Sequence, residues 1–447
     1  MTPAARVQAV IEIIDAIEQS LVRQGAPADD LIRSYFARRR YAGSRDRAAI
    51  TDLVYRILRH RARIRACLEQ TGTAVSARLM VLGDLVVLGG AADDEIANLF
   101  RGDRFAPAPL TREEWALVAG LRQVMPDSLP RSARLEVPEW LEPFLEARFQ
   151  DAFESELSAL GERAPVTIRA NRLKTTRDAL RDHLEAENVL ASHCRYAPEG
   201  LIVKDSKGLS QTKAFRDGLF EVQDEAAQLA ALIVDAAPGQ QVLDLCAGAG
   251  GKTLAVAAAM ANSGQLYAAD VNRGRLEELK RRAKRAGAHD VQPLLLDEAG
   301  DRRKAKLGDL TGRFDRVILD VPCSGSGTWR RNPDLRWRYG PHDLERFLEL
   351  QRRLLDEAAE LVKPGGRIVY ITCSLLPPEN EDQIRAFLDR HCDFAVMPYE
   401  LLLPDRVQGL PAGDCGLDGA LCLTPATHGT DGFFVAVMAR ERTSEFA

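Results

Sequence analysis

Residues 242–253 read VLDLCAGAGGKT, an aliphatic strand pattern that runs into a glycine-rich turn and then a helix. Glycines in such a turn let the backbone approach a ligand closely, beside the positive end of the following helix. A phosphate-binding P-loop would need a glycine at Cys246, and a dinucleotide-binding fingerprint would need a small residue at Thr253. Both templates fail at a single position, so the turn predicts a ligand site of another kind at the end of a strand.

The alternation of strands and helices continues after this turn. Strands are predicted at 242–247, 266–270, 291–297, 317–321 and 367–373, with helices such as 254–260 and 276–286 between them. Repeated strand–helix units predict an α/β fold, in which helices cover both faces of a parallel sheet. Residues 432–439 predict a last strand that closes one edge of this sheet.

The chain before residue 238 follows two other patterns. In residues 1–137 apolar residues recur at steps of three and four, which predicts an all-helical domain that ends in a proline-rich linker. Residues 138–237 predict a small α+β module with strands at 166–171 and 200–203. We therefore expect three domains, at 1–137, 138–237 and 238–447.

The composition of the 447 residues is that of a globular protein, with 46% hydrophobic and 28% charged residues. It excludes a disordered or fibrous chain. The longest apolar stretch, 79–92, is interrupted by Asp84 and is too short to span a membrane, and no secretory leader is evident. The eight cysteines contain no Cys-x-x-Cys pair, so neither a disulfide framework nor a metal site is predicted. We expect a monomeric protein of the reducing cytoplasm, without membrane or metal partners.

Two acidic residues end the next strands of the predicted sheet. Asp270 ends the second strand, where a carboxylate can accept hydrogen bonds from two ribose hydroxyls, and Asp297 ends the third, where it can face an adenine edge. Ligands of open parallel sheets bind at this carboxyl end of the strands. An adenosine that carries a short charged tail fits this set, so we predict S-adenosylmethionine as the cofactor. The alternative is that these acids only cap the following helices.

Two cysteines follow the fourth and fifth strands. Cys323 lies in DVPCSG at 320–325, and Cys373 lies in TCS at 372–374. A lone cysteine is most often part of an inert core, but adjacent strands would place these two thiols in the ligand crevice. There a thiolate can add to C6 of a cytosine and turn the ring into an enamine, whose C5 then attacks a methyl sulfonium. Asp320 is placed to hold N3 and the exocyclic amine of that cytosine. Cationic side chains or helix ends beside the thiols should lower the thiol pKa from about 8.5.

Arginines are concentrated in two segments, although the formal net charge is -5. Eleven lie between Arg33 and Arg65, against only two aspartates, and residues 329–338 interleave cations with aromatic side chains. We predict that both segments contact RNA, the second beside a target base that must be single-stranded or flipped out. The predicted contacts are Arg38, Arg39, Arg40, Arg56, Arg59, Arg330, Arg331 and Arg336. The alternative is that these arginines only cover solvent-exposed helix faces.

A set of short motifs together resembles the RNA (cytosine-C5) methyltransferases, particularly the bacterial Fmu/Sun type that acts on 16S rRNA. The motifs are CAxxGGKT at 246–253, DxPCSG at 320–325, TCS at 372–374, RxNxLK at 169–174, VQD at 222–224 and DGFF at 431–434. The resemblance covers nearly the whole chain and implies a Rossmann-like methyltransferase domain, a NusB-like helical N-terminal domain and an RNA-binding α+β module. The sequence departs from the family pattern at Gly248-Ala249, where Ala-Pro is usual.

The resemblance also implies roles for individual residues. Cys373 would be the nucleophile and Cys323 would assist release of the product, a choice that spacing alone leaves open. The expected cofactor-binding residues are Cys246, Ala247, Gly248, Ala249, Gly250, Gly251, Lys252, Asp270, Arg275, Asp297 and Asp320. The α+β module would contact RNA through Arg169, Asn171 and Lys174. Two alternatives remain, a transfer RNA methyltransferase and a non-enzymatic RNA-binding or assembly factor, and the second has no chemical need for two cysteines in the crevice.

Overall fold

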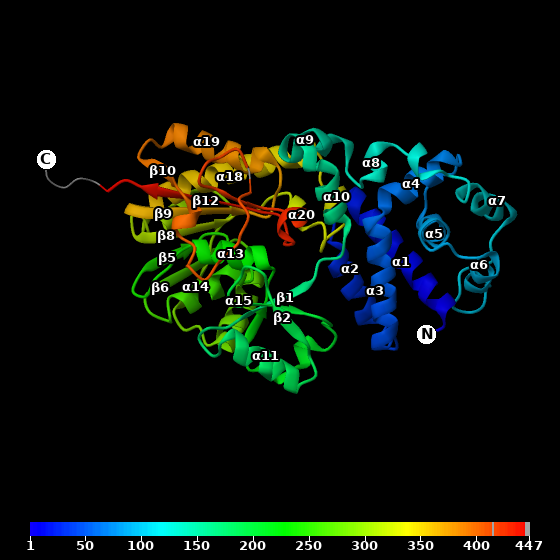
Figure 1. Cartoon of the computed structure of the whole chain (residues 1–447), viewed down its shortest axis with the longest axis horizontal. Helices are drawn as coiled ribbons and strands as arrows, with labels where there is room; N and C mark the ends of the chain where they lie inside the picture. The colour runs from blue at the N-terminus through cyan, green and yellow to red at the C-terminus, as the bar shows by residue number, and fades with distance from the viewer. Residues whose placement is uncertain (414, 443–447) are drawn as a thin grey trace. The chain divides into compact units, whose positions relative to one another are not determined.

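The computed structural model describes residues 1–413 and 415–442. These residues form two compact units (Figure 1): Met1–Glu162 with Trp329–His342, and Arg163–Thr328 with the chain from Asp343 onward. Residues 138–162 therefore group with the N-terminal helices, and the small α+β module groups with the large sheet. Two compact units do not locate the limits of the three expected domains. The domain boundaries at 137 and 237 therefore stay a prediction.

The first unit is helical, as the sequence predicts. Its helices are α1 (Pro3–Arg23), α2 (Ala28–Arg38), α3 (Ser44–Arg59), α4 (Arg61–Gln70), α5 (Ala77–Gly83), α6 (Asp93–Leu99), α7 (Arg112–Leu121), α8 (Arg131–Arg134), α9 (Glu142–Phe149), α10 (Phe153–Gly161) and α17 (Leu335–Arg338), with a π-helical turn at Asp84–Leu88. The first helix begins where Thr2 caps it, since the threonine side chain accepts a hydrogen bond from the backbone N–H of Ala5.

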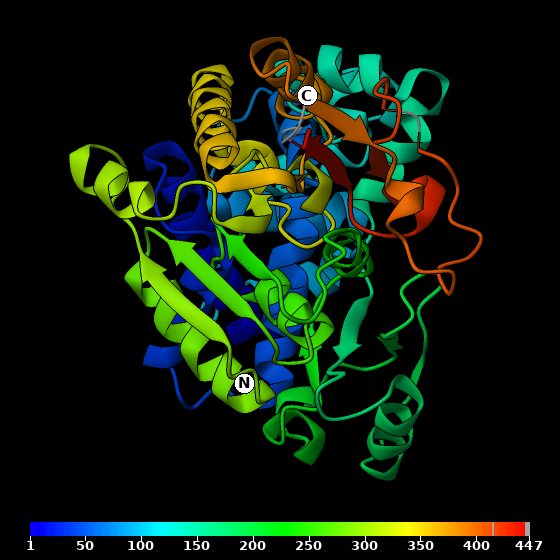
Figure 2. The same cartoon turned by 90° about the vertical axis from the view of Figure 1, so that its left-hand side faces the viewer.

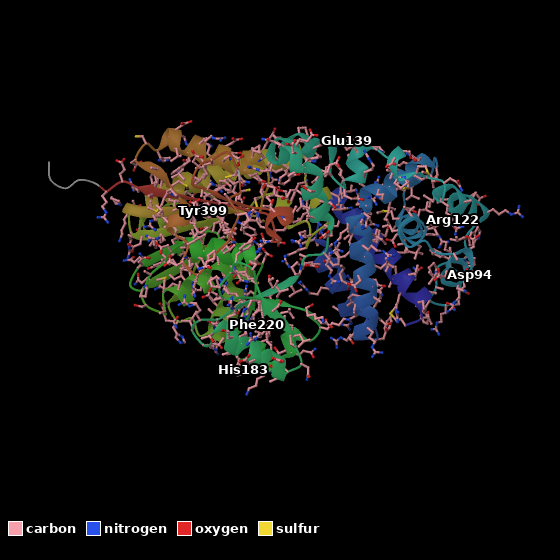
Figure 3. All side chains as sticks on the ribbon, viewed as in Figure 1. Asp94, Arg122, Glu139, His183, Phe220 and Tyr399 are labelled. Atoms are coloured by element: carbon pink, nitrogen blue, oxygen red, sulfur yellow. The ribbon has the colours of Figure 1, made fainter. Side chains whose placement is uncertain are left out.

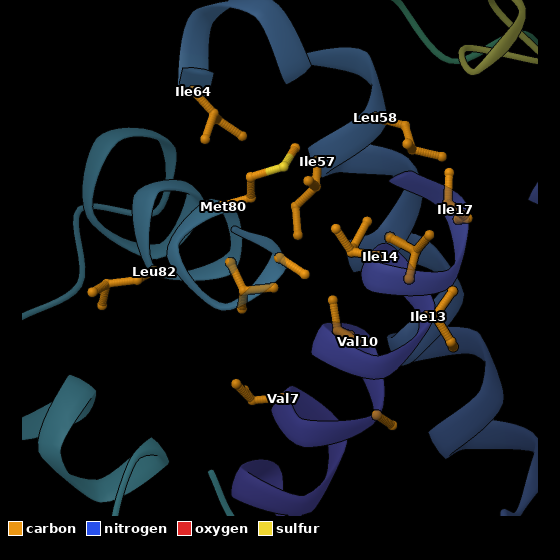
Figure 4. Close-up of a cluster of buried hydrophobic side chains, with 14 of the residues drawn as sticks. Val7, Val10, Ile13, Ile14, Ile17, Ile57, Leu58, Ile64, Met80 and Leu82 are labelled. Atoms are coloured by element: carbon orange, nitrogen blue, oxygen red, sulfur yellow. The ribbon is translucent and has the colours of Figure 1, made fainter. Parts of the chain in front are cut away.

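The core of this unit is formed by the apolar faces of α1, α3 and α5 (Figure 4). Val10, Ile14 and Ile17 recur at steps of three and four, which places them on one face of α1. They belong to the same buried cluster as Ile57 of α3 and Met80 of α5, and all five side chains are fully buried. Burial of this apolar face of α1 stabilises the packing of the shorter helices around it.

The second unit contains a small antiparallel sheet whose strand order is β2-β3-β1-β4. The strands are β1 (Val166–Ala170), β2 (Ala191–His193), β3 (Gly200–Val203) and β4 (Phe220–Val222), and the helices of the module are α11 (Arg177–Ala186) and α12 (Lys213–Arg216). Phe220 of β4 is fully buried and packs in one cluster with Ile168 of β1 and Leu180 of α11 (Figure 3). The predicted α+β module is therefore present.

The large sheet has the strand order β10-β12-β9-β8-β5-β6-β7. Its strands are β5 (Gln241–Asp244), β6 (Gln265–Asp270), β7 (Val291–Leu295), β8 (Phe314–Asp320), β9 (Val362–Thr372), β10 (Phe394–Met397), β11 (Leu421–Leu423) and β12 (Phe433–Arg440). Strands β5 to β9 pair in parallel, and β12 pairs antiparallel with β9, β10 and β11. The predicted α/β fold is confirmed. The predicted edge position of the last strand is wrong, because the short strand β10 lies beyond it.

Helices cover both faces of this sheet, as predicted (Figure 1, Figure 2). They are α13 (Glu225–Ile233), α14 (Gly251–Ala259), α15 (Arg273–Ala286), α16 (Asp301–Gly308), α18 (Pro341–Leu361), α19 (Glu381–Arg390) and α20 (Pro425–His428). Successive strand residues point to opposite faces: Val369 and Ile371 of β9 pack in a cluster with α13 and α14, and Ile368 and Tyr370 pack in a cluster with α18 and α19. None of the helices in the described part of the chain is both long and apolar enough to cross a membrane.

Candidate active site

The glycine-rich turn connects β5 to α14 at the carboxyl end of the sheet. Gly248 and Gly250 have φ angles of +55° and +85°, a conformation that glycine adopts without strain. A Cβ atom on Gly250 would lie 2.8 Å from Leu279 of α15, so this part of the turn is closely packed. Apart from its chain neighbours, no described residue comes within 4 Å of the corresponding position on Gly248. The turn is therefore packed at one glycine and open at the other, which leaves room for a ligand.

Asp270, at the end of β6, fixes this turn to the neighbouring strand. One carboxylate oxygen accepts the backbone N–H of Gly248 at 2.8 Å, and the other accepts the backbone N–H of Asn272 at 2.7 Å. The alternative that Asp270 only caps α15 is wrong, because Asn272 is the cap and accepts the backbone N–H of Arg275. Two arginines also brace the turn: Arg282 donates to the carbonyl of Ala249, and Arg169 donates to the carbonyl of Gly251.

The other predicted cofactor-binding residues lie along the same edge with different contacts. Asp297 follows β7, and its carboxylate lies 3.1 Å from the ammonium group of Lys306. It does not cap α16, whose cap position is Gly300. Arg275 is exposed on the first turn of α15. Cys246 lies beneath the turn, where burial raises the pKa of its thiol well above the ordinary range.

Lys252, the second residue of α14, is paired with the acid that ends β8. Its ammonium group lies 2.7 Å from the carboxylate of Asp320 and 5.1 Å from the centre of the Phe433 ring. The Lys252 side chain is buried, whereas that of Asp320 remains 35% exposed. Lys252 thus fixes Asp320 from inside the protein and leaves the carboxylate accessible from the crevice.

The two predicted thiols meet at this edge. Cys323 follows β8 and Cys373 follows β9, the adjacent parallel strand, and their sulfur atoms lie 3.5 Å apart. All eight cysteines lie within the described residues, and none of them forms a disulfide bond. The hydrogen bond to Cys373, together with burial and the nearby Glu379 carboxylate, raises the pKa of the Cys323 thiol well above its ordinary value. Cys323 is therefore protonated at neutral pH.

Glu379 and Asn380 form a buried polar cluster behind the thiols with Gln351 of α18, and sequence reasoning did not identify them. The only local signal is the run PPENE at 377–381, directly after the second cysteine loop. The contacts of this polar cluster connect both cysteine loops. No group of three or more His, Cys, Asp or Glu side chains in the described chain is arranged to hold a metal ion.

The residues expected to bind RNA in the small module are engaged within the protein instead. Asn171 donates to the carbonyls of Gly218 and Ala286 at 2.8 and 2.7 Å. Lys174 donates to the carbonyls of Asp217 and Arg285, both at 2.7 Å. Two of these four carbonyls end α15, so the side chains join the module to that helix. Arg169 is buried, and besides Gly251 it contacts the side chain of Gln223. The predicted RNA role of these three side chains does not fit the contacts observed.

The segment predicted to clamp RNA is also largely buried. The side chain of Arg336 is 1% exposed and donates to the carbonyls of Glu136 at 3.1 Å and Leu160 at 2.6 Å. Arg330 is likewise buried, and Arg331 is half-buried. The prediction for Arg336 is therefore wrong, since its guanidinium group holds the backbone of the first unit.

The arginines of the N-terminal helices fall into two groups. Arg56 pairs with the fully buried Asp84, Arg39 pairs with Glu12 at 2.8 Å, and Arg59 contacts the carbonyl of Arg330 at 3.4 Å. Arg38 and Arg40, at the end of α2, are exposed. These two remain the best placed of the predicted phosphate contacts.

Comparisons with known proteins agree with this architecture. Residues 231–439 match the family described as 16S rRNA methyltransferase RsmB/F, and residues 137–209 match the ferredoxin-like domain of RsmF/B-like methyltransferases. A probable ribosomal RNA small subunit methyltransferase B of Synechocystis sp. is 33% identical over 412 residues, which cover 88% of this chain and 90% of the relative. The ribosomal RNA small subunit methyltransferase B of Shewanella oneidensis is 30% identical over 413 residues, 88% of this chain and 91% of the relative.

A solved structure gives the same result for the fold. The crystal structure of PH0851 superimposes with a TM-score of 0.80 and 30% sequence identity, covering 98% of this chain and 99% of that one. These matches confirm the resemblance drawn from the motifs, and they show that this chain belongs to the RsmB/F family of 16S rRNA methyltransferases.

Proposed function

We propose that this enzyme transfers a methyl group from S-adenosylmethionine to C5 of a cytosine in 16S rRNA, through a transient bond between Cys373 and C6. The observation that carries the proposal is the pair of free thiols 3.5 Å apart, beside the carboxylate of Asp320, at the carboxyl end of a parallel sheet. The names of the relatives, which specify the small ribosomal subunit, support the substrate. A transfer RNA substrate would leave the chemistry unchanged.

The residues at the turn fit S-adenosylmethionine. The open space at Gly248 lies beside Asp270, whose carboxylate is already oriented by two backbone N–H groups and can still accept ribose hydroxyls through its remaining lone pairs. Asp297, at the end of the next strand, would face the adenine edge. When bound, the cofactor supplies a methyl group that is electrophilic because a sulfonium carries it.

We assign the attack to Cys373, as the family resemblance implies, because the raised pKa of Cys323 keeps that thiol protonated and a protonated thiol is a poor nucleophile. Cys373 adds to C6, and C5 gains the electron density that it needs to accept a methyl group. Asp320 accepts a hydrogen bond from the exocyclic amine of the cytosine and so orients the base, while Lys252 keeps the carboxylate in place.

Release of the product requires loss of the C5 proton. Once Cys373 is bonded to C6, it is a thioether and no longer the hydrogen-bond partner that raises the pKa of Cys323. The main cause of the raised Cys323 pKa is then removed, so Cys323 can lose its proton to solvent and accept the proton from C5. The electron pair of that C–H bond restores the ring, and Cys373 leaves as a thiolate.

Asp320→Asn should lower kcat by about 10²-fold or more, since the amide can turn a donor toward the cytosine amine and then no longer holds the base in the reactive orientation. Methyl transfer from labelled S-adenosylmethionine to a 16S rRNA transcript measures this. Asp315→Asn is the matched control, because Asp315 lies at the opposite end of the same strand, where it accepts the backbone N–H of Gln241. Equal rates for the two variants would contradict the role given to Asp320.

Arg38→Ala combined with Arg40→Ala should raise the KM for RNA about tenfold and leave kcat unchanged. Loss of two phosphate contacts should also reduce the slope of log affinity against log salt by about 2. Filter binding over a salt series measures the slope. The control is Arg281→Ala, which removes a highly exposed arginine that lies on α15 and not near α2 in the sequence. An unchanged slope would remove α2 from the RNA-binding surface.

The substrate is tested by comparing transcripts of 16S rRNA and transfer RNA as methyl acceptors. Incorporation into 16S rRNA at cytosine C5 supports the proposal. Incorporation into transfer RNA alone would overturn the substrate, and binding of 16S rRNA without any incorporation would favour the assembly factor.

A further inference from the structure

Glu379 is a fully buried carboxylate that lies between the two cysteine loops, in the turn after β9. One oxygen accepts the backbone N–H of Ser324 at 2.9 Å and the side-chain amide of Gln351 at 3.0 Å. The other oxygen accepts the hydroxyl groups of Ser324 and Ser374, both at 2.5 Å. Ser324 directly follows Cys323, and Ser374 directly follows Cys373. One carboxylate therefore bridges the residues that follow the two thiols.

The hydrogen bonds are consistent with an ionised carboxylate. The hydroxyl of Ser374 accepts the backbone N–H of Leu376, and the hydroxyl of Ser326 accepts the backbone N–H of Leu375. The hydroxyl groups of Ser324 and Ser374 donate to Glu379. The four groups around the carboxylate can all act as donors and stabilise its ionised form, whereas its burial raises the pKa of Glu379.

The residue that directly precedes each cysteine is also held by a hydrogen bond. Gln351 donates to the carbonyl of Pro322, directly before Cys323, at 3.0 Å. Asn380 accepts the hydroxyl of Thr372 at 2.6 Å and donates to the carbonyl of Ser374 at 2.9 Å, so it clamps the residues on both sides of Cys373. The cluster thus fixes the backbone around both sulfur atoms.

We propose that Glu379 is a positioning residue for the thiol pair: its carboxylate joins the residues that follow Cys323 and Cys373, and so holds the two cysteine loops and their sulfur atoms at a fixed separation. The proposal rests on the proposed function for the roles of the thiols. Glu379 itself touches neither substrate nor cofactor. Removal of its charge should make Cys323 easier to ionise and should loosen the spacing of the pair.

Glu379→Gln keeps the size of the side chain and removes the charge. We expect kcat to fall by about 10²-fold, because a displacement of about 1 Å in a reacting group has this effect, while the affinity for S-adenosylmethionine stays at the wild-type value. A second measurement separates positioning from a general loss of structure. Alkylation of each cysteine by iodoacetamide, followed by mass spectrometry of its peptide, should show mainly Cys373 modified in the wild type and a rising share of Cys323 in the variant.

Two further variants keep the test decisive. Glu379→Asp retains the charge and should recover the preferential alkylation of Cys373. If Glu379→Gln does not fold, Ser324→Ala takes its place: it removes one donor to Glu379 and should shift alkylation partway toward Cys323. Glu225→Gln is the control, since Glu225 is a buried carboxylate of the same unit that accepts the backbone N–H groups of Tyr196 and Ala197. An alkylation pattern in Glu379→Gln equal to that of the control would overturn the proposal. Alkylation is independent of methyl transfer, so an enzyme that lacks the proposed activity would still give this answer.

Discussion

We expect Cys373→Ala to lower methyl transfer to RNA by at least about 10⁴-fold, while S-adenosylmethionine should still bind with the affinity of the wild type. Without the thiol no bond to C6 forms, and C5 of cytosine stays too weak a nucleophile to take up the methyl group. The turn between β5 and α14, where we propose that the cofactor binds, lies on other elements and does not include this side chain. Single-turnover transfer of labelled methyl groups measures the first effect, and isothermal titration calorimetry measures the second.

The control for this variant is Cys392→Ala, which removes an exposed free thiol. It should retain full activity. Substantial turnover by Cys373→Ala, or a covalent protein–RNA complex formed by it, would contradict the assignment of Cys373 as the nucleophile.

Cys323→Ala should instead accumulate a covalent complex of protein and methylated RNA. Cys373 can still attack C6, and methyl transfer can still occur once, but the group that removes the C5 proton is missing. We expect about one methyl group transferred per enzyme and a fall in steady-state kcat of about 10³-fold. Denaturing gel electrophoresis with labelled RNA shows the complex as a slowly migrating band that requires S-adenosylmethionine.

The double variant Cys323→Ala/Cys373→Ala provides the comparison, since it should form no complex. If Cys323→Ala turned over at the wild-type rate, another group would be the base for the C5 proton. If the complex persisted in the double variant, a different nucleophile would be responsible.

The fold and the meeting of the thiols could be predicted because they depend on local patterns. Parallel strands bring their carboxyl ends to one edge, so Asp270, Cys323 and Cys373 could be assigned to one crevice from the order of strands alone. The pairing of Lys252 with Asp320 could not be anticipated in the same way, because it depends on the direction in which two side chains leave different elements.

The arginines show where sequence reasoning fails. A guanidinium group binds phosphate oxygens and backbone carbonyls equally well, and its partners can be remote in sequence. The carbonyls that bind Arg336 lie 200 and 176 positions away, at Glu136 and Leu160. Nothing in the segment itself distinguishes such an internal contact from an RNA contact.

Glu379 escaped prediction for a related reason. Its donors come from three separate segments, the loops after β8 and β9 and the helix α18. A lone glutamate in a turn is ordinarily a solvated residue. Only the packing of these segments shows that this one is buried and shared by both thiol loops.

Bisulfite sequencing of 16S rRNA from cells with and without this gene tests the central claim most directly. 5-Methylcytosine resists deamination, so the account predicts a protected cytosine that is present with the gene, is lost without it, and returns with the wild-type gene but not with Cys373→Ala. An identical pattern of protected cytosines in 16S rRNA from both strains, under conditions in which the protein is expressed, would contradict it.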